Sequence, residues 1–194
     1  MTIELKNFLV KKFLLHACCA PCSIYVLDKL RPEHDLVVFF YNPNIQPRAE
    51  YEQRKEELKK YCQKIGIDFI DADYDYQKWF ALTDKHKTCP EKGERCSICF
   101  QERLSVSGEY AKNHGFDLWG TTLTISPHKN ADLINQIGRG VGERVGVPFY
   151  EADWKKADGF KIATQMSKDE GFYRQDYCGC VYSWQERNRK TNNL

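Results

Sequence analysis

Cysteine supplies most of the chemistry that this sequence offers. Seven of its nine cysteines lie in three short motifs. These motifs are HACCAPCS with Cys18, Cys19 and Cys22, ERCSICFQERL with Cys96 and Cys99, and QDYCGCVYS with Cys178 and Cys180. Thiolates at such close spacing bind zinc or iron–sulfur clusters, or form redox-active disulfides. The sequence therefore predicts a metal centre or a redox site built from thiols.

The first motif directly precedes a predicted helix. A helix N-terminus stabilises a thiolate, which suits a redox disulfide, and the C-x-x-C spacing of Cys19 and Cys22 also lets two sulfurs reach one metal. A redox motif of the thioredoxin type has no need for the additional Cys18, so a metal is the favoured interpretation. The alternative is that these cysteines are small buried residues in a tight turn.

The second and third motifs have different geometric requirements. Cys96 and Cys99 begin a predicted helix and resemble half of a zinc ribbon. The first motif lies far outside the ribbon spacing of roughly 15–20 residues, so the fold must bring the two together. Cys178 and Cys180 converge only if the backbone turns sharply, which Gly179 permits. This C-x-C is also interpreted as a pair of metal ligands.

Two cysteines fall outside these motifs. Cys62 lies with Tyr61 and Ile65 on the apolar face of a predicted helix and is expected in the core. Cys89 precedes Pro90 in a polar loop; it could be a ligand but is not counted in the site.

The other seven cysteines divide into four that saturate a 4Fe–4S cluster or a structural zinc, and three that leave a second metal with an open position. The alternative division is one cluster beside a redox dithiol, which would allow a disulfide bond.

Strands and helices alternate along the chain, and this alternation predicts how the motifs are positioned. Strands are expected at residues 12–16, 35–41, 68–72 and 118–121, and helices at 23–30, 50–65, 98–113, 132–144 and 161–170. The pattern predicts one α/β domain over residues 1–194 with a mostly parallel sheet, helices on both faces in a Rossmann-like arrangement, and a helical, basic part at 150–194. Ligands of such sheets bind at the carboxyl ends of the strands. The loop at 17–23 follows the first strand and reads ACCAPCS, without the glycines of a phosphate-binding loop.

Composition limits the class of protein and its location in the cell. With 42% hydrophobic and 29% charged residues and a net charge of +2, the chain is typical of a globular protein. No segment approaches the roughly 18 apolar residues that span a membrane. Lys11 and Lys12 interrupt the place where a signal peptide needs its apolar run, so a cytoplasmic location without membrane contact is expected. The terminal sequence RNRKTNNL is basic and could contact nucleic-acid phosphates or simply be solvated.

Six blocks together resemble the QueH-type epoxyqueuosine reductases. They run from His16 to Ser183 in the family's order: HACCAPCS, YNPNIQPRAEYEQRK, DADYDYQKWF, RCSICFQERL, SPHKN and FYRQDYCGCVYS. The resemblance implies reduction of the epoxide of epoxyqueuosine at the tRNA wobble position to the alkene of queuosine, the last step of queuosine biosynthesis, without cobalamin. It also implies a 4Fe–4S cluster, with the seven motif cysteines as metal ligands. The second metal, iron or zinc, and an external electron donor complete this hypothesis.

A fainter likeness concerns architecture alone. The strand, loop and helix around the first motif resemble the PP-loop ATPase-like (adenine nucleotide alpha hydrolase-like) fold of tRNA thiolation enzymes, although the S-G-G-x-D-S phosphate loop is missing. Two other functions stay open at this point. One is a zinc-binding, non-catalytic tRNA adaptor, and the other is a tRNA sulfur-transfer enzyme on the related fold. The surplus thiols disfavour the adaptor, and the missing glycines disfavour the sulfur-transfer enzyme.

Candidates for proton transfer and substrate binding are drawn from the expected strand ends and from the third motif. The proposed catalytic residues are Asp73, Asp176 and Tyr177, and the proposed substrate-binding residues are Tyr41, Asn42, Lys129, Asn130 and Tyr173. Trp79, Phe80 and Trp154 are further candidates for stacking on a splayed-out base. His16 ends an apolar strand, and a hydrogen-bonded structural role is expected for it rather than metal binding.

Overall fold

The computed structural model describes residues 10–191. The expectation that no signal peptide is present rests partly on residues 1–9, and the basic tail includes residues 192–194; both segments lie outside the described residues.

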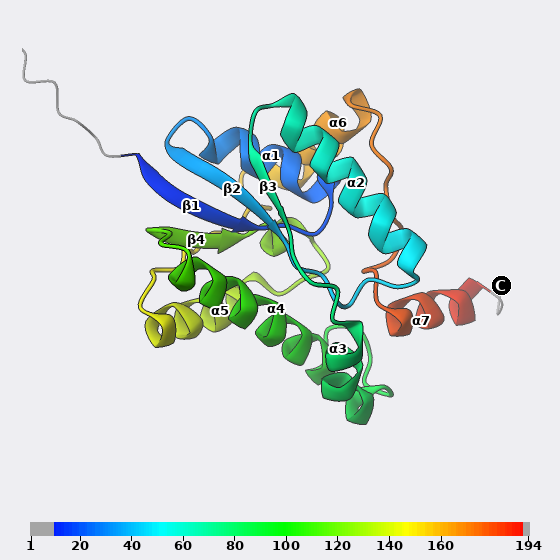
Figure 1. The fold of residues 1–194 in the computed structure, drawn as a ribbon. Coiled ribbons are helices and arrows are strands. Elements are labelled where there is room, and N and C mark those ends of the chain that lie inside the picture. The colour runs from blue at the N-terminus through cyan, green and yellow to red at the C-terminus, as the bar shows by residue number, and fades with distance from the viewer. Residues whose placement is uncertain (1–9, 192–194) are drawn as a thin grey trace, which may run out of the picture.

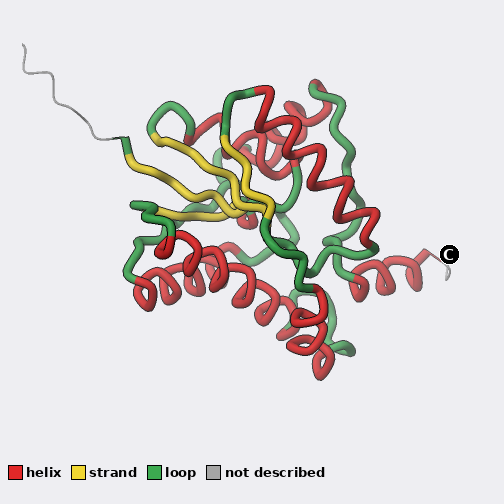
Figure 2. Tube along the Cα trace, in the orientation of Figure 1, coloured by secondary structure: helices red, strands yellow, loops and turns green. Residues whose placement is uncertain are grey.

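Four strands form the centre of the molecule: β1 (Lys11–His16), β2 (His34–Phe40), β3 (Asp68–Asp71) and β4 (Leu118–Thr121). They pair in the order β3-β2-β1-β4, and every pairing is parallel. Figure 2 shows these strands enclosed by helices.

Side chains alternate between the two faces of the sheet. Phe13 and Leu15 of β1 join one apolar cluster, whereas Leu14 joins a second cluster on the opposite face. The same alternation separates Val38 from Val37 in β2. Both faces are therefore buried, which explains why these strands are continuous apolar runs in the sequence.

Helices cover each face as a separate layer. One layer holds α1 (Ala20–Leu30), α2 (Arg48–Lys64) and α6 (Gly159–Asp169), and the other holds α4 (Glu94–Asn113) and α5 (Ala131–Val145) (Figure 1). Helix α2 buries Tyr51, Leu58 and Cys62, and of its charged side chains it also buries Glu50 and Arg54. The predicted α/β architecture, with a parallel sheet and helices on both faces, is confirmed. The likeness to the PP-loop fold and the single-domain assignment of residues 1–194 remain predictions.

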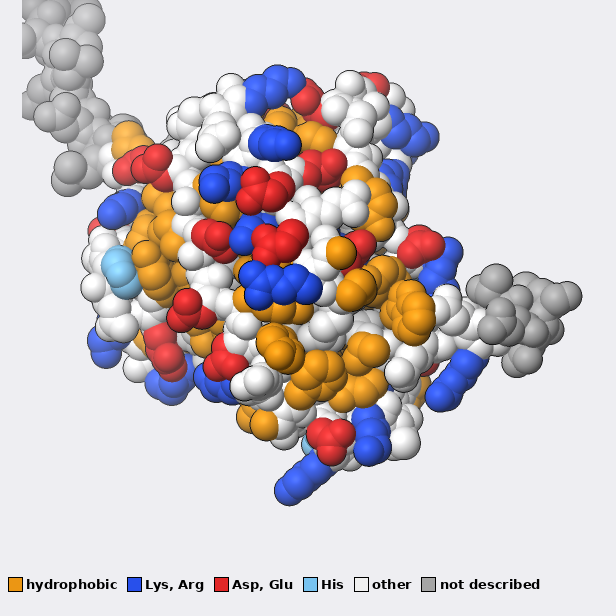
Figure 3. Space-filling view, turned by 45° about the vertical axis from the view of Figure 1, so that its right-hand side comes forward, with side chains coloured by type: hydrophobic (Ala, Val, Ile, Leu, Met, Phe, Trp, Pro, Cys, Tyr) orange, Lys and Arg blue, Asp and Glu red, His pale blue; other side chains and the backbone are white. Residues whose placement is uncertain are grey.

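Two helices lie outside the ranges expected for individual helices, and the second of them falls in the predicted helical part at 150–194. Helix α3 (Tyr76–Thr83) starts at Asp75, whose carboxylate caps it by accepting a hydrogen bond from the Lys78 N–H. Helix α7 (Val181–Thr191) starts directly after the C-x-C motif. Tyr76 and Leu82 of α3 are exposed. Figure 3 shows hydrophobic side chains gathered on one face of the molecule. The 3-10 turns η1 (Asp84–His86) and η2 (Leu123–Ile125) complete the elements of the described chain.

No helix within residues 10–191 is both long enough and apolar enough to cross a membrane.

Candidate metal centre and its cavity

The loop of the first cysteine motif is held at the carboxyl edge of the sheet by backbone and side-chain hydrogen bonds. The Ala17 N–H donates to the Phe39 carbonyl, 3.1 Å away. Asn42, fully buried after β2, donates from Nδ2 to the Ala17 carbonyl at 2.9 Å. Cys19 is the extended N-cap residue of α1, and Pro21 follows in the first turn. This strand-to-helix turn lies between β2 and β4, where the strand order reverses and such folds bind ligands.

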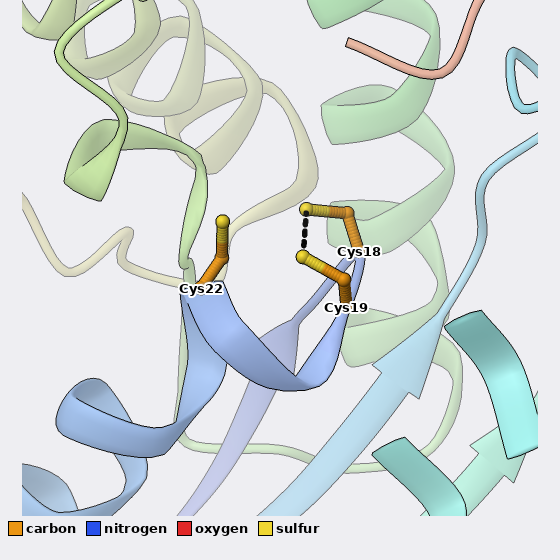
Figure 4. Close-up of side chains that lie close together, drawn as sticks. All are labelled: Cys18, Cys19 and Cys22. Atoms are coloured by element: carbon orange, nitrogen blue, oxygen red, sulfur yellow. Dashed lines mark hydrogen bonds between the residues drawn. The ribbon is translucent and has the colours of Figure 1, made fainter. Parts of the chain in front are cut away.

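The sulfurs of Cys18, Cys19 and Cys22 converge at this turn. All three lie within 4.8 Å of one another, and the Cys18 and Cys19 sulfurs are 3.7 Å apart. Figure 4 shows the three side chains on the same side of the turn. Hydrogen bonds from Cys19 and Cys22 hold the pKa of Cys18 well below its usual range, and the bond with Cys18 raises the pKa of Cys19 to about 12. A shared negative charge is thus favoured among three convergent thiols, which is the donor set that a soft metal requires.

Buried cations surround this group. Arg54 and Arg103 are each 1% exposed. Lys129 is half-buried, and although burial lowers its pKa, the negative charges of Cys178, Cys18 and Cys22 raise it overall. Arg103 donates to the Asn42 Oδ1 atom at 2.5 Å, so one contact chain links the guanidinium to the thiol loop. Buried positive charge needs a compensating anion. Glu50 meets part of that requirement by pairing with Arg54 at 2.6 Å, and thiolates or an anionic metal–thiolate group would meet the rest.

The second and third motifs meet on the neighbouring side of the site. Cys99 and Cys180 belong to one small apolar cluster with Trp79 and Tyr182. Burial raises the pKa of Cys96 to about 11, and the nearby Cys178 and Cys99 thiols add to that rise. Within residues 10–191, no three of the four sulfurs approach within 4.8 Å of one another. The fold therefore groups the thiols as a tight set of three and a looser set of four.

The residues around the looser set also suit a metal–sulfur group. Trp79 is buried beside Cys99. Its indole N–H makes no hydrogen bond of full geometry in the described part of the chain, but it lies close enough to the Cys99 sulfur to oppose the rise that burial causes in the pKa of that thiol. A buried N–H beside a cysteine is available to donate to sulfur, and such bonds tune iron–sulfur centres.

The turn at Gly179 brings Cys178 and Cys180 to the site. Gly179 has a φ of 112°, which disfavours any residue with a Cβ atom. A Cβ there would also lie 3.0 Å from a guanidinium nitrogen of Arg54. That guanidinium donates to the Cys178 carbonyl at 3.3 Å, and the Gly179 carbonyl accepts from the Gln46 N–H at 2.8 Å. The turn is thus tied to the loop after β2.

A cavity of about 470 Å³ opens onto both sets of thiols. Cys18, Cys22 and Cys178 contribute to its wall, and Phe160 and Arg174 also line it. This volume lies within the range of small-molecule sites. A ligand in this cavity would lie beside the thiols, among the cationic side chains of Lys129 and Arg174 and the carboxylates of Glu91 and Glu186.

The predicted substrate-binding residues divide between the cavity and its supports. Lys129 lines the cavity. Tyr41 is buried with its hydroxyl donating to Glu102 at 3.2 Å, and Asn42 supports the thiol loop as described above. Asn130 caps α5 by accepting from the Leu133 N–H. Tyr173 donates from its hydroxyl to Glu50 at 3.1 Å and is not among the residues that line the cavity.

The predicted catalytic residues also differ in placement. Asp176 and Tyr177 both line the cavity. Asp176 is exposed and pairs with Arg187 at 2.8 Å. The Tyr177 hydroxyl donates to the Gln46 carbonyl at 2.7 Å, and burial raises its pKa to about 12. Asp73 is exposed after β3 and does not line the cavity.

Three residues expected to serve other roles are part of the scaffold. Trp79 is 1% exposed, and the Trp154 indole donates to the Thr121 carbonyl at 3.1 Å, so neither is free to stack on a base. Phe80 packs against the Trp79 cluster.

His16 has the structural role that the sequence predicts. It is fully buried between Thr121 Oγ1 at 2.8 Å and the Tyr41 carbonyl at 3.1 Å. Burial lowers its pKa to about 3, so it is neutral.

Several site residues escaped the sequence reasoning. Arg103 lies one helical turn after Cys99, on the face that carries Cys96, and this spacing is the signal that was available. Arg54 is surrounded by other charged residues in α2, and no pattern distinguishes it from them. Gln175, which donates to the Cys19 sulfur at 3.1 Å, and Phe160 likewise lie in segments without a motif.

Fold and site define a class of protein, an α/β protein with a group of cysteines able to bind metal at the carboxyl edge of a parallel sheet. Comparison with known proteins gives the family. The family model for epoxyqueuosine reductase QueH matches residues 13–186, and the chain belongs to this family. A protein named epoxyqueuosine reductase QueH from Haemophilus influenzae is 43% identical over 180 residues, covering 92% of this chain and 74% of that protein.

Two further relatives carry the same name. The Acinetobacter baylyi protein is 43% identical over 180 residues, which cover 92% of this chain and 83% of its own. The Thermotoga maritima protein is 36% identical over 180 residues, which cover 91% and 92%. The resemblance inferred from the six sequence blocks is therefore confirmed.

Proposed function

We propose that this chain reduces epoxyqueuosine in tRNA to queuosine, as the names of its relatives indicate. The observation that carries the proposal is the set of three convergent thiols at the wall of a cavity of about 470 Å³. Membership of the QueH family supplies the substrate. The same membership weighs against the zinc adaptor and the sulfur-transfer enzyme.

The reaction removes the epoxide oxygen as water. Breaking both C–O bonds and forming the C=C bond takes two electrons and two protons. A thiol-bound metal centre, when present, would supply the electrons one at a time and a Lewis-acid position for oxygen. An external donor would restore these electrons, and the resemblance to the QueH-type enzymes implies that the reaction proceeds without cobalamin.

We assign the two sets of thiols to two centres. Cys96, Cys99, Cys178 and Cys180 would hold a 4Fe–4S cluster, which four thiolates saturate. Cys18, Cys19 and Cys22 would hold a second metal, iron or zinc, with one position open toward the cavity. The proximity of the three sulfurs and the Trp79 N–H beside Cys99 support this division.

The chain's own residues would bind the nucleotide and manage its protons. Asp176 and Tyr177 are the candidates for proton transfer because both line the cavity. The raised pKa of Tyr177 keeps its hydroxyl protonated until a stronger base develops on the substrate. Asp73 lies apart from the cavity lining, so no role is proposed for it.

The cavity's mouth would bind the anticodon loop. Lys129 and Arg174 bring positive charge toward phosphates, and Phe160 offers a ring on which an unstacked base can lie. A tRNA substrate places the proposed reaction in the cytoplasm.

Metal analysis tests the proposal directly. Anaerobically purified protein should contain iron and acid-labile sulfide. Cys22→Ala should lower the iron content and abolish epoxide reduction, because it removes one of three convergent ligands. Cys62→Ala is the matched control: Cys62 is fully buried in the core, so reduction should be largely retained. Zinc without sulfide, or an active Cys22→Ala enzyme, would overturn the assignment.

A further inference from the structure

Cys89 belongs to a second group of metal-ligating side chains, separate from the seven motif cysteines. Its sulfur, a ring nitrogen of His86 and a carboxylate oxygen of Glu94 all lie within 4.8 Å of one another. His86 Nδ1 is 3.2 Å from a Glu94 carboxylate oxygen. Within residues 10–191, this group and the first cysteine motif are the two places where three such donors meet.

Local structure brings the three donors together from two elements. His86 ends the 3-10 turn η1, and the Cys89 N–H donates to the His86 carbonyl at 3.0 Å, which gives a tight H-x-x-C turn. Glu94 is the first residue of α4, after the N-cap Gly93. Lys92 has a φ of 72°, a left-handed conformation that a non-glycine residue adopts at some cost, and the loop reverses there.

Buried contacts hold this loop in place. The Arg95 guanidinium, 1% exposed, donates to the carbonyls of Lys87 and Cys89. It also pairs with Glu186 of α7 at 3.0 Å. The Lys87 ammonium group pairs with Asp84 at 3.7 Å. The turn is thus anchored from the side opposite solvent.

The donor types select the ligand. Sulfur, imidazole nitrogen and carboxylate oxygen are together the set that zinc binds, and three protein ligands leave its fourth position to water. His86 and Cys89 are half-buried, while Glu94 is exposed, so water can reach that position. Hard cations such as Mg²⁺ and Ca²⁺ prefer all-oxygen sites and are disfavoured here.

We propose that His86, Cys89 and Glu94 form a zinc site that ties η1 to the first turn of α4. None of the three residues lines the cavity, and the last of them, Glu94, lies two residues before Cys96. It would fix the start of the helix that carries Cys96 and Cys99. The proposal does not depend on which reaction the cavity performs.

Zinc loading of the intact iron–sulfur protein tests this site. Protein reconstituted with iron and sulfide under anaerobic conditions would be incubated with zinc sulfate and desalted, and zinc, iron and sulfide would be measured per chain. We expect Cys89→Ser and His86→Ala each to bind about one zinc per chain fewer than the natural protein, whichever metal the three motif thiols hold. The matched controls Cys62→Ala and His114→Ala should retain that zinc. Unchanged iron and sulfide would show that the variants are folded.

X-ray absorption at the zinc edge identifies the ligands. We expect one sulfur at about 2.3 Å and nitrogen or oxygen neighbours at about 2.0–2.2 Å. Zinc lodged in the motif thiols would instead show three or four sulfurs. A sulfur-rich spectrum that is the same in Cys89→Ser and in the natural protein, or equal zinc content in the two, would overturn the proposal.

Discussion

Individual side chains of this site are held by partners that neutralise or orient them. Asn42 illustrates the point, because one amide group serves both the thiol loop and a buried cation. Its Nδ2 atom donates to the Ala17 carbonyl, and its Oδ1 atom accepts from Arg103. The loop that presents Cys18 and Cys19 therefore depends on a residue that makes no contact with the cavity.

Asn42→Ala should lower both stability and metal content. The substitution leaves a buried carbonyl and a buried guanidinium without these bonds, which costs about 1–3 kcal/mol. Urea unfolding and iron analysis would measure the two effects. Asn135 lies on α5, and Asn135→Ala removes its one half-buried hydrogen bond to the Ala152 carbonyl, which should leave the iron content unchanged. Equal iron loss in both variants would contradict the role given to Asn42.

Phe160→Ala should weaken tRNA binding. Phe160 lines the cavity with 37% of its surface exposed, and a stacked base contributes about 1–3 kcal/mol, so a roughly tenfold rise in Kd is expected. Phe160→Trp should restore affinity. Ile162→Ala is the control, since Ile162 is 41% exposed on the same helix but does not line the cavity. Equal effects of the two alanine substitutions, measured by anisotropy, would argue against stacking.

At the scale of elements, close helix packing on one face positions α4 and α5. Helix α5 uses glycine where neighbours approach: a Cβ on Gly138 would lie 2.4 Å from the Phe149 ring. The same helix starts at Asn130, directly after the cavity residue Lys129. Packing of α5 thus determines where Lys129 lies.

Two glycines of α5 should respond oppositely to alanine. Gly138→Ala forces the Phe149 ring to move from Trp119, 4.7 Å away between ring centres, and should cost about 1–3 kcal/mol of unfolding free energy. Gly140 faces open space, so Gly140→Ala should add about 0.5–1 kcal/mol through helix propensity. Thermal or urea unfolding distinguishes the two. A stabilising Gly138→Ala would show that the packing is looser than described.

At the scale of the whole molecule, the parallel sheet collects distant motifs at one edge. The carboxyl ends of β1 and β2 lie in register, with His16 opposite Phe39, and the thiol loop and Asn42 follow directly. The segment from α6 to α7 then crosses this edge and adds Arg174 and Cys178 to the cavity. Net charge is only +2, so attraction of tRNA must come from local rather than global charge.

Binding of tRNA should weaken as salt rises, and Arg174 should account for part of that dependence. Each phosphate contact to single-stranded nucleic acid contributes about 0.7 to the slope of log K against log salt. Arg174→Gln should reduce the slope by about this amount. Arg31→Gln, exposed at the far end of α1, should not change it. Affinity that is independent of salt would contradict phosphate binding at the cavity mouth.

Much of this architecture was accessible from sequence patterns. The run 35–41 predicted a buried strand because both faces of a parallel sheet are covered, and the stripe with Tyr61 and Cys62 predicted α2. Helix α3 escaped because it spans a single short segment with two buried residues, Trp79 and Thr83. Arg103 escaped because a charged helical residue is normally expected at the surface.

The sequence by itself determined the chemistry of this protein: which thiols occur in close pairs, which strands alternate with helices, and which family the order of motifs indicates. Only the tertiary structure decided how the thiols are grouped, that Arg54 and Arg103 lie buried among them, and that Cys89 meets His86 and Glu94. The physical reason is distance. Local spacing specifies neighbours within a turn or a helix, whereas contacts between remote segments depend on strand order and on how the helices pack against the sheet.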